Sequence, residues 1–347
     1  MKTIGIPRGL FFYYYYPLWR TFFEKLGVQV VVSAPTNRRI VDQGLLTAVN
    51  EACLPVKVYY GHVLDLCHRG VDYIFAPRLV SVEYRGYICP KFMGIPDMLR
   101  AQIPDLPPLI DIKVDLSRDE RQLERDVFEL GKLFGSDRYK VKAAWAAGQQ
   151  ELEEFRRIAA VGFPLNQAVT IWERAGEAPM ASGDKTRLNP GGENIRTGGE
   201  ASEATPRSSD LTIGVLGHGY SLCDAMVSMG LVRKLQELGA RVVTAEMLKT
   251  DEVEAYASTL PKRMFWTLGK KNIGSALWMD EEPAVDGIIY LACFGCGPDS
   301  LVGEIIARRV VNTPFMMMIV DEHTGEAGVV TRLEAFYDMV ARRKNAV

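Results

Sequence analysis

The stretch Leu-Ala-Cys-Phe-Gly-Cys-Gly-Pro-Asp-Ser, residues 291–300, decides how the fold of this chain is interpreted. The apolar residues 287–291 predict a strand that runs into it, and Pro298 predicts the first turn of a helix. Open α/β sheets bind their ligands at such strand–helix junctions, where a helix amino terminus also stabilises thiolates. Cys293 and Cys296 therefore lie where a metal or a redox group would be bound.

The composition is that of a globular protein with real hydrophobic cores. The chain has 347 residues, 48% of them hydrophobic, which is enough for two domains. Its net charge of −2 gives no reason to expect binding to nucleic acid, and no apolar run reaches the length of a membrane span. Residues 1–3 lead directly into an expected strand, so we expect no signal peptide and a cytoplasmic protein. In that compartment the six cysteines are expected to be metal ligands, catalytic groups or core residues rather than disulfides.

The second half of the chain repeats the first, because four expected strands reappear after 209, 212, 214 and 210 residues. The paired segments are 4–6 with 213–215, 25–31 with 237–243, 71–75 with 285–289, and 109–111 with 319–321. A near-constant offset indicates two copies of one domain, and strands that alternate with helices predict a parallel sheet in each copy. We therefore predict an α/β fold of two pseudo-repeated, Rossmann-like domains, residues 1–116 and 211–347.

Two segments separate the predicted domains. Residues 117–178 are expected to form a helical bridge, because Leu123, Val127 and Leu130 recur at helical spacing. Residues 179–210 are mostly small, polar or charged and cannot bury apolar area, so they are predicted to be a disordered linker or insertion. If the two domains face each other, their strand-end loops open into one interdomain cleft, where we expect a metal cluster.

Three cysteines share one setting, a loop that leads through a proline into an expected helix. They are Cys53, Cys89 and Cys296. A cysteine followed by a proline is common beside iron–sulfur clusters. Single cysteines often pack in the core as small hydrophobic residues, but three in the same setting favour the ligands of one metal site. Zinc is the competing metal, although it usually takes closely spaced pairs of ligands, and only Cys293 and Cys296 form such a pair.

Two further cysteines, Cys293 and Cys223, are candidate metal ligands in less regular surroundings. Cys293 directly follows a strand, and Cys223 lies at the start of the first helix of the second half. Each is a fourth ligand, a ligand of a larger cluster, or a core residue. Cys67 lies about four helical turns beyond Cys53, at a rise of about 1.5 Å per residue, and is interpreted as structural.

Four side chains in expected strand-end loops are candidate catalytic residues, because acids and histidines placed there can move protons. They are Glu83, His218, Glu322 and His323. Glu83 belongs to an expected irregular loop over residues 77–91, and the loop 321–326 is equally well explained as a solvated turn before the last helix. The loop at His218 lacks the phosphate-binding patterns, and no nucleotide-binding fingerprint occurs elsewhere in the sequence.

Several of these segments together resemble a known family. The segments are 51–57, 77–81, 88–91, 294–300, 321–328 and 331–336. They resemble the acyl-CoA dehydratase activase-related proteins. That family is similar to the component D subunits of 2-hydroxyacyl-CoA dehydratases, to benzoyl-CoA reductase subunits and to double-cubane cluster proteins. The resemblance covers nearly the whole chain except residues 179–210.

The resemblance implies a [4Fe-4S] cluster held by Cys53, Cys89 and Cys296. It also implies an ATP-hydrolysing activator protein that delivers low-potential electrons, a homo- or heterodimeric assembly, and a small-molecule substrate such as a CoA thioester. Dehydratase subunits use such electrons to make a ketyl radical from the thioester. Cys223 and Cys293 depart from the simplest pattern, and they leave open a double-cubane [8Fe-9S] cluster, which in that branch needs six thiolates.

Three functions remain open at this point. The first is an iron–sulfur enzyme, either a reductase or a 2-hydroxyacyl-CoA dehydratase-like lyase, which receives its electrons from an ATP-dependent partner. The second is a non-catalytic iron–sulfur regulator or accessory protein of such a system. The third is a metal-free binding module.

Overall fold

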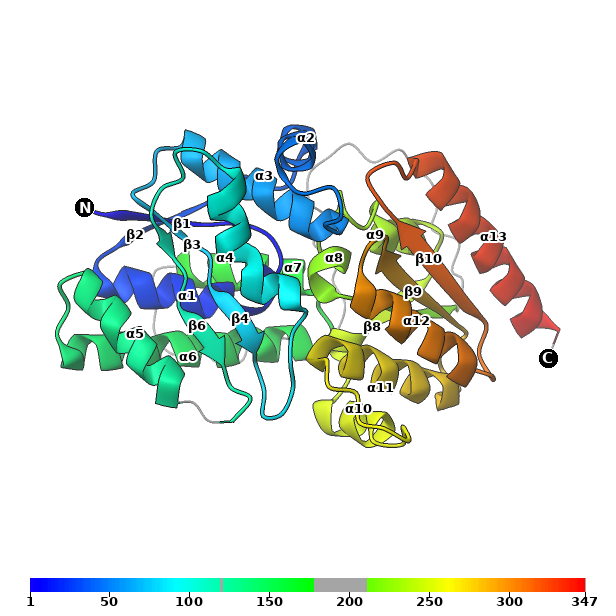
Figure 1. Cartoon of the computed structure of the whole chain (residues 1–347). Coiled ribbons are helices and arrows are strands. Elements are labelled where there is room, and N and C mark those ends of the chain that lie inside the picture. Colours follow the sequence, from blue (N-terminus) through cyan, green and yellow to red (C-terminus); the bar gives the residue numbers. More distant parts are fainter. Residues whose placement is uncertain (119–120, 178–210, 347) are drawn as a thin grey trace.

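Two parallel sheets form the centres of the two halves of the chain (Figure 1). The computed structural model describes residues 1–118, 121–177 and 211–346, so the predicted linker at 179–210 lies outside the described residues. Helices lie on both faces of each sheet (Figure 1). The predicted α/β class with two Rossmann-like pseudo-repeats is confirmed.

The strands of the two sheets correspond one to one. The first sheet contains β1 (Thr3–Ile6), β2 (Gln29–Val32), β3 (Tyr73–Phe75) and β5 (Leu109–Ile110), and the second contains β7 (Thr212–Gly217), β8 (Arg241–Thr244), β9 (Gly287–Cys293) and β10 (Phe315–Val320). Their orders are β2-β1-β3-β5 and β8-β7-β9-β10, with every pairing parallel. All seven residues of β9 are buried, as expected of an inner strand covered on both faces. The four pairs of segments that the sequence repeat identifies are thus the strands of the two sheets, and equivalent strands occupy equivalent positions in them.

The helices connect these strands and flank them. In the first half they are α1 (Phe12–Leu26), α2 (Arg38–Thr47), α3 (Leu54–His68), α4 (Pro90–Gln102), α5 (Arg121–Leu133), α6 (Arg138–Ala160) and α7 (Leu165–Glu177). In the second half they are α8 (Gly219–Leu222), α9 (Leu231–Glu237), the 3-10 turn η1 (Ala245–Met247), α10 (Thr250–Ala257), α11 (Thr267–Glu281), α12 (Gly297–Arg309) and α13 (Glu326–Asn345). Among the described residues, none of these helices has the length and apolar character of a membrane span.

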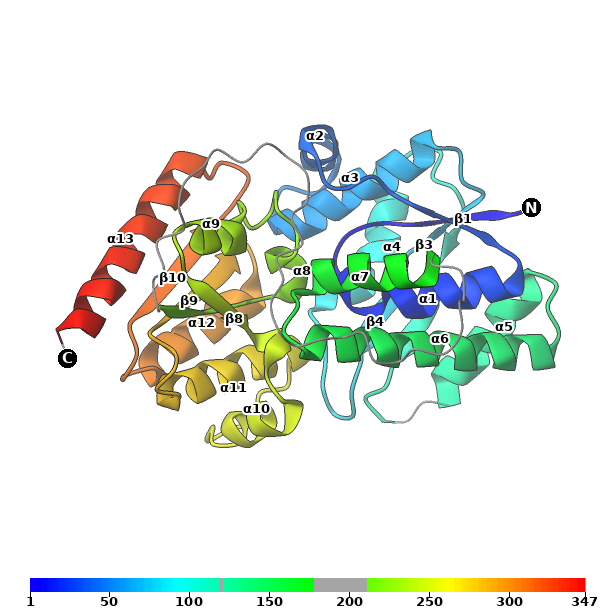
Figure 2. The same ribbon diagram turned by 180° about the vertical axis from the view of Figure 1, so that it is seen from behind.

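Aromatic side chains fasten the long helix α6 to α1. The Trp145 ring lies 5.5 Å from that of Trp19 and 5.9 Å from that of Phe22, measured between centroids. Large aromatic rings bury much apolar area each, so such contacts make a firm helix pair. Figure 2 shows α6 and α7 running alongside α1. At its other end α6 contacts η1 of the second half.

The prediction of an irregular loop over residues 77–91 is partly wrong. Within it the structure forms β4 (Arg78–Ser81), which pairs in parallel with β6 (Lys113–Asp115). The register shifts between Leu79 and Ser81. The residues of β4 show no clear alternation of polar and apolar side chains, so the local sequence does not predict a strand there. The strand forms by pairing with β6, which lies further along the chain.

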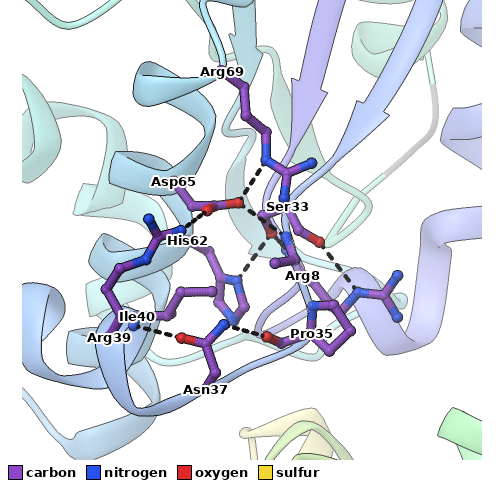
Figure 3. Close-up of polar contacts among 10 residues, drawn as sticks. Arg8, Ser33, Pro35, Asn37, Arg39, Ile40, His62, Asp65 and Arg69 are labelled. Carbon is purple, nitrogen blue, oxygen red and sulfur yellow. Dashed lines mark hydrogen bonds and ion pairs between the residues drawn. The ribbon is translucent and has the colours of Figure 1, made fainter.

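A chain of buried and partly buried hydrogen bonds joins the two halves. The backbone N–H of Arg8 donates to the hydroxyl of Ser33 over 2.8 Å, and that hydroxyl lies 2.9 Å from Nδ1 of His62 (Figure 3). Nε2 of His62 lies 3.0 Å from Oγ1 of Thr36, whose hydroxyl donates to Asp224 over 2.5 Å. Because Thr36 gives its single proton to Asp224, it accepts from Nε2–H of a neutral His62. Burial, and next the charge of Arg8, lower the pKa of His62 to about 3.

We expect His62 to lower the free energy of unfolding in mild acid. The unfolded chain binds a proton at this histidine below about pH 6.5, whereas the folded chain does not until far lower pH. This residue alone should cost about 1.4 kcal/mol of unfolding free energy per pH unit below that value. Urea unfolding at pH 7 and pH 5 should show a smaller loss in His62→Gln than in the wild type. Equal losses in both proteins would assign the acid sensitivity to other groups.

Candidate metal centre

The three cysteines with a shared sequence setting occupy equivalent places in the structure. Cys53, Cys89 and Cys296 are the N-cap residues of α3, α4 and α12, and each helix has a proline in its first two positions. The first N–H groups of a helix have no partner within it, and they carry its positive end. Each thiol therefore lies where a thiolate or an anionic cluster is favoured.

The loops that carry these cysteines meet. The ammonium group of Lys91 donates to the carbonyl oxygens of Glu51 and Gly295, over 3.0 and 3.3 Å. Gly295 has φ +73°, and a Cβ on it would lie 3.9 Å from Cα of Cys53. Lys91, in the first turn of α4, thus joins that helix to the loops before α3 and α12, and residues from both halves form one site.

The side chains of Cys53 and Cys296 interact. This interaction is the largest cause that lowers the pKa of Cys53 to about 7 and raises that of Cys296. Burial raises the pKa of Cys89, and the neighbouring charge of Cys53 adds to this shift. A metal bound by these three thiols would deprotonate all of them.

His218 and Asp299 complete this centre. Nε2 of His218 lies 3.0 Å from Oδ1 of Asp299 and 4.0 Å from Sγ of Cys296. Asp299 also accepts from the Tyr290 hydroxyl over 2.8 Å and from the backbone N–H of Cys293 over 3.2 Å. Burial opposes both shifts, but the pair raises the pKa of His218 and lowers that of Asp299. Ligand atoms of His218, Cys296 and Asp299 lie within 4.8 Å of one another.

The two additional cysteines lie in different surroundings. Sγ of Cys293 is 3.7 Å from Oγ of Ser221, next to Asp299, at the edge of the same site. Cys223 follows α8 and lines a separate cavity of about 220 Å³ with Asn166 and Asp224. The structure therefore brings Cys293 close to the three N-cap cysteines and leaves Cys223 in another cavity. Cys67 lies in the last turn of α3, away from the N-cap end.

The four candidate catalytic residues do not converge. His218 is buried in the centre, and Glu322 forms an ion pair of 2.5 Å with Lys57, in the first turn of α3. Glu83 pairs instead with Lys270 over 3.0 Å in a cleft between the halves. His323 is exposed, and its backbone N–H donates to Asp321.

The donor set fits an iron–sulfur cluster. Thiols are the usual ligands of such clusters, and here three of them lie at helix amino termini that stabilise negative charge. Nδ1 of His218 is buried without a hydrogen-bond partner, which is costly unless a polar group reaches it. Gly297, next to Cys296, has open space where a Cβ would be. The site thus has both the chemistry and an unsatisfied donor or acceptor expected around a bound group.

Sequence reasoning missed Asp299 and Lys91. Asp299 lies in the first turn of α12, where an acidic residue is ordinarily explained by the helix dipole. Its contact with His218 depends on a segment that is distant in the sequence, whereas Tyr290 lies in the strand that leads into α12. Lys91 follows the Cys-Pro pair, but nothing in the local sequence shows that it reaches two other loops.

Comparisons with known proteins place the chain in a family. A family model described as "CoA enzyme activase uncharacterised domain (DUF2229)" matches residues 3–248. A comparison with curated proteins gave no match. Among solved structures, a putative phosphosugar isomerase from Silicibacter pomeroyi DSS-3 shares 12% identity at a TM-score of 0.19, over 100% of this chain and 87% of that one, a likeness too low to carry an argument. Because the family model covers most of the sequence, the chain belongs to the CoA enzyme activase family that it describes.

Proposed function

We propose that this protein is an iron–sulfur redox protein related to the 2-hydroxyacyl-CoA dehydratase subunits. It accepts low-potential electrons from a separate ATP-hydrolysing activator and passes them to a small substrate, for reduction or for dehydration. The observation that carries this proposal is the meeting of three N-cap cysteines from both halves of the chain at one site. Membership in the CoA enzyme activase family supports the same conclusion.

The residues of the centre have separate tasks in this proposal. Cys53, Cys89 and Cys296 hold a [4Fe-4S] cluster, which with three thiolates has one iron open for Lewis-acid or redox chemistry. Asp299 contacts Nε2 of His218 and thereby fixes the orientation of the imidazole ring. His218 is then the group placed to hold or move a proton beside the site.

The proposed partner supplies the ATP chemistry. The sequence contains neither the Gly-x-Gly-x-x-Gly fingerprint nor a Walker A motif. A low-potential cluster needs an energetic electron donor, and we assign the ATP hydrolysis to a separate activator. The first half carries Cys53 and Cys89 and the second carries Cys296, so a partner that shifts one half against the other changes the geometry at the centre.

Anaerobic isolation followed by reduction tests the proposal. We expect about four iron atoms and as many acid-labile sulfides per chain. An activator ATPase of the dehydratase type, with ATP and a reductant, should produce the electron paramagnetic resonance signal of the reduced cluster. The same mixture without ATP should not. Equal reduction without ATP would instead favour a regulatory or accessory iron–sulfur protein.

A mononuclear zinc site is the second candidate. The ligand atoms of His218, Cys296 and Asp299 lie within 4.8 Å of one another, and zinc binds nitrogen, sulfur and oxygen ligands. Elemental analysis separates the two candidates. One zinc per chain without sulfide would support this site and overturn the cluster.

A further inference from the structure

The first half contains a mostly apolar cavity. Its volume is about 310 Å³, and it lies between α1 and α6 on one side and α4 with the β4–β6 pair on the other. Trp19, Phe75, Leu79, Phe92 and Trp145 are among its walls. Protein interiors are close-packed, and voids much larger than a water molecule are few. A cavity of this size is within the range of small-molecule binding sites.

The wall of the cavity is held in a strained conformation. Leu10, in the loop after β1, has φ +52° although it is a buried, bulky residue. Such a backbone conformation costs about 1–2 kcal/mol for residues other than glycine, and strain of this kind clusters at binding sites. Leu10 is one of the residues that line the cavity.

The cavity adjoins the cleft between the two halves, and we call the residues that line both of them the neck. Phe11, Tyr15, Val82 and Arg156 line both the cavity and this cleft, which has a volume of about 590 Å³. The neck is therefore apolar on most sides, with one guanidinium group and one phenol as its polar groups. Arg156 reaches it from α6, and its guanidinium carbon lies 6.0 Å from the centroid of the Tyr15 ring.

Arg156 differs from the other basic residues of the cleft. Lys249, Lys270 and Lys271 pair with carboxylates, namely Glu252, Glu83 with Glu254, and Glu246. Arg156 forms no ion pair with any carboxylate in the described part of the chain. Burial lowers the pKa of Lys271 to about 8, and the positive charge of Arg156 acts in the same direction. The neck thus has a positive charge that an anionic ligand would neutralise.

We propose that this cavity binds a small monocarboxylic acid, with an apolar tail of about eight carbons inside and its carboxylate on Arg156 at the neck. The volume equals that of about ten liquid water molecules, at about 30 Å³ each, and a methylene group occupies a similar space. The planar guanidinium matches a carboxylate in two parallel hydrogen bonds. This binding requires no metal and no electron transfer, so it goes beyond the function proposed above.

The ligand would lie next to the metal centre without entering it. Phe11 and Phe92 line the cavity, and their rings lie 6.4 and 5.7 Å from that of Tyr220. Tyr220 in turn stacks on His218 at 4.9 Å. An aromatic wall thus separates the apolar tail from the centre.

Calorimetric titration of the full chain tests the proposal with three probes. Sodium octanoate should bind with one site per chain. Sodium butanoate should bind roughly 100-fold or more weakly, because it loses four buried methylene groups. Octan-1-ol, which has the tail without the charge, should bind roughly tenfold or more weakly than octanoate. Absence of saturable octanoate binding, or equal affinities for octanoate and octanol, would overturn the proposal.

Two variants on α6 locate the carboxylate. Arg156→Gln should weaken octanoate binding roughly tenfold or more and leave octanol binding unchanged. Arg157→Gln is the matched control, because this neighbouring arginine, exposed like Arg156, pairs with Glu154 and does not line the cavity. Equal affinities of the two variants for octanoate would contradict the assignment of Arg156. Val82→Phe should narrow the neck and weaken both long ligands, and where it fails to fold, the two arginine variants decide the question.

Discussion

Replacing Cys296 with alanine should reduce the iron content of the anaerobically isolated protein from about four atoms per chain to near zero. Cys53→Ala and Cys89→Ala should have the same effect. Each cysteine caps a different helix, so neighbouring thiols of the same helix cannot replace it. A cubane with only two protein thiolates is poorly held. Iron and sulfide analysis, together with the visible absorption of the cluster, measures the loss.

Cys67→Ala is the matched control for these substitutions. Cys67 lies on α3, the same helix that Cys53 caps, but in its last turn. This variant should retain its iron and sulfide. Cys223→Ala and Cys293→Ala then decide the cluster type, because a double cubane needs further thiolates, whereas unchanged iron in both would leave a three-cysteine cubane. Full iron in Cys296→Ala would contradict the proposed ligand set.

Gly61→Ala should destabilise the protein by about 3 kcal/mol or more, through overpacking that side chains cannot relieve. Helices α2 and α3 pack backbone against backbone at this point. A Cβ on Gly61 would overlap the carbonyl oxygen of Ile40, and a Cβ on Gly44 would overlap that of Lys57. The substitution would force apart two helices, one of which is capped by Cys53. Urea unfolding measures the change in the free energy of unfolding.

Gly94→Ala is the control for this prediction. Gly94 lies within α4, and a Cβ on it would meet only Sδ of Met98, at 3.9 Å. An alanine there should be neutral or stabilise the helix by about 0.5–1 kcal/mol. Similar unfolding midpoints for the two variants would show that α2 and α3 can separate at little cost.

The sequence was sufficient for the sheets because their signal is local and repeated. Unbroken apolar runs such as residues 287–291 identify buried parallel strands, and the offsets between the halves fix their correspondence. It was not sufficient for β4, whose pairing with β6 is non-local. The setting of Cys53, Cys89 and Cys296 was likewise visible, because a proline after a loop cysteine predicts a helix start.

The surroundings of the site depend on contacts between distant segments. Asp299 has an ordinary position at a helix start, and only the fold brings the distant His218 to its carboxylate. Thr36 and Asp224 are likewise 188 residues apart and meet in one hydrogen bond. No periodicity or motif encodes such pairs. The sequence also does not show that Arg156 lacks a carboxylate partner among the described residues, because this depends on where the other side chains lie.

The positions of the N-cap cysteines along the chain also set the order in which the three thiols appear during synthesis. Cys296 follows Cys89 by 207 residues. At about 5–20 residues per second, a ribosome adds that length in roughly 10 to 40 seconds. For that interval Cys53 and Cys89 are present without their counterpart, and the loop before α12 does not yet exist. A metal centre built on these three thiols would therefore be completed only after Cys296, which follows β9 in the second sheet, has been translated.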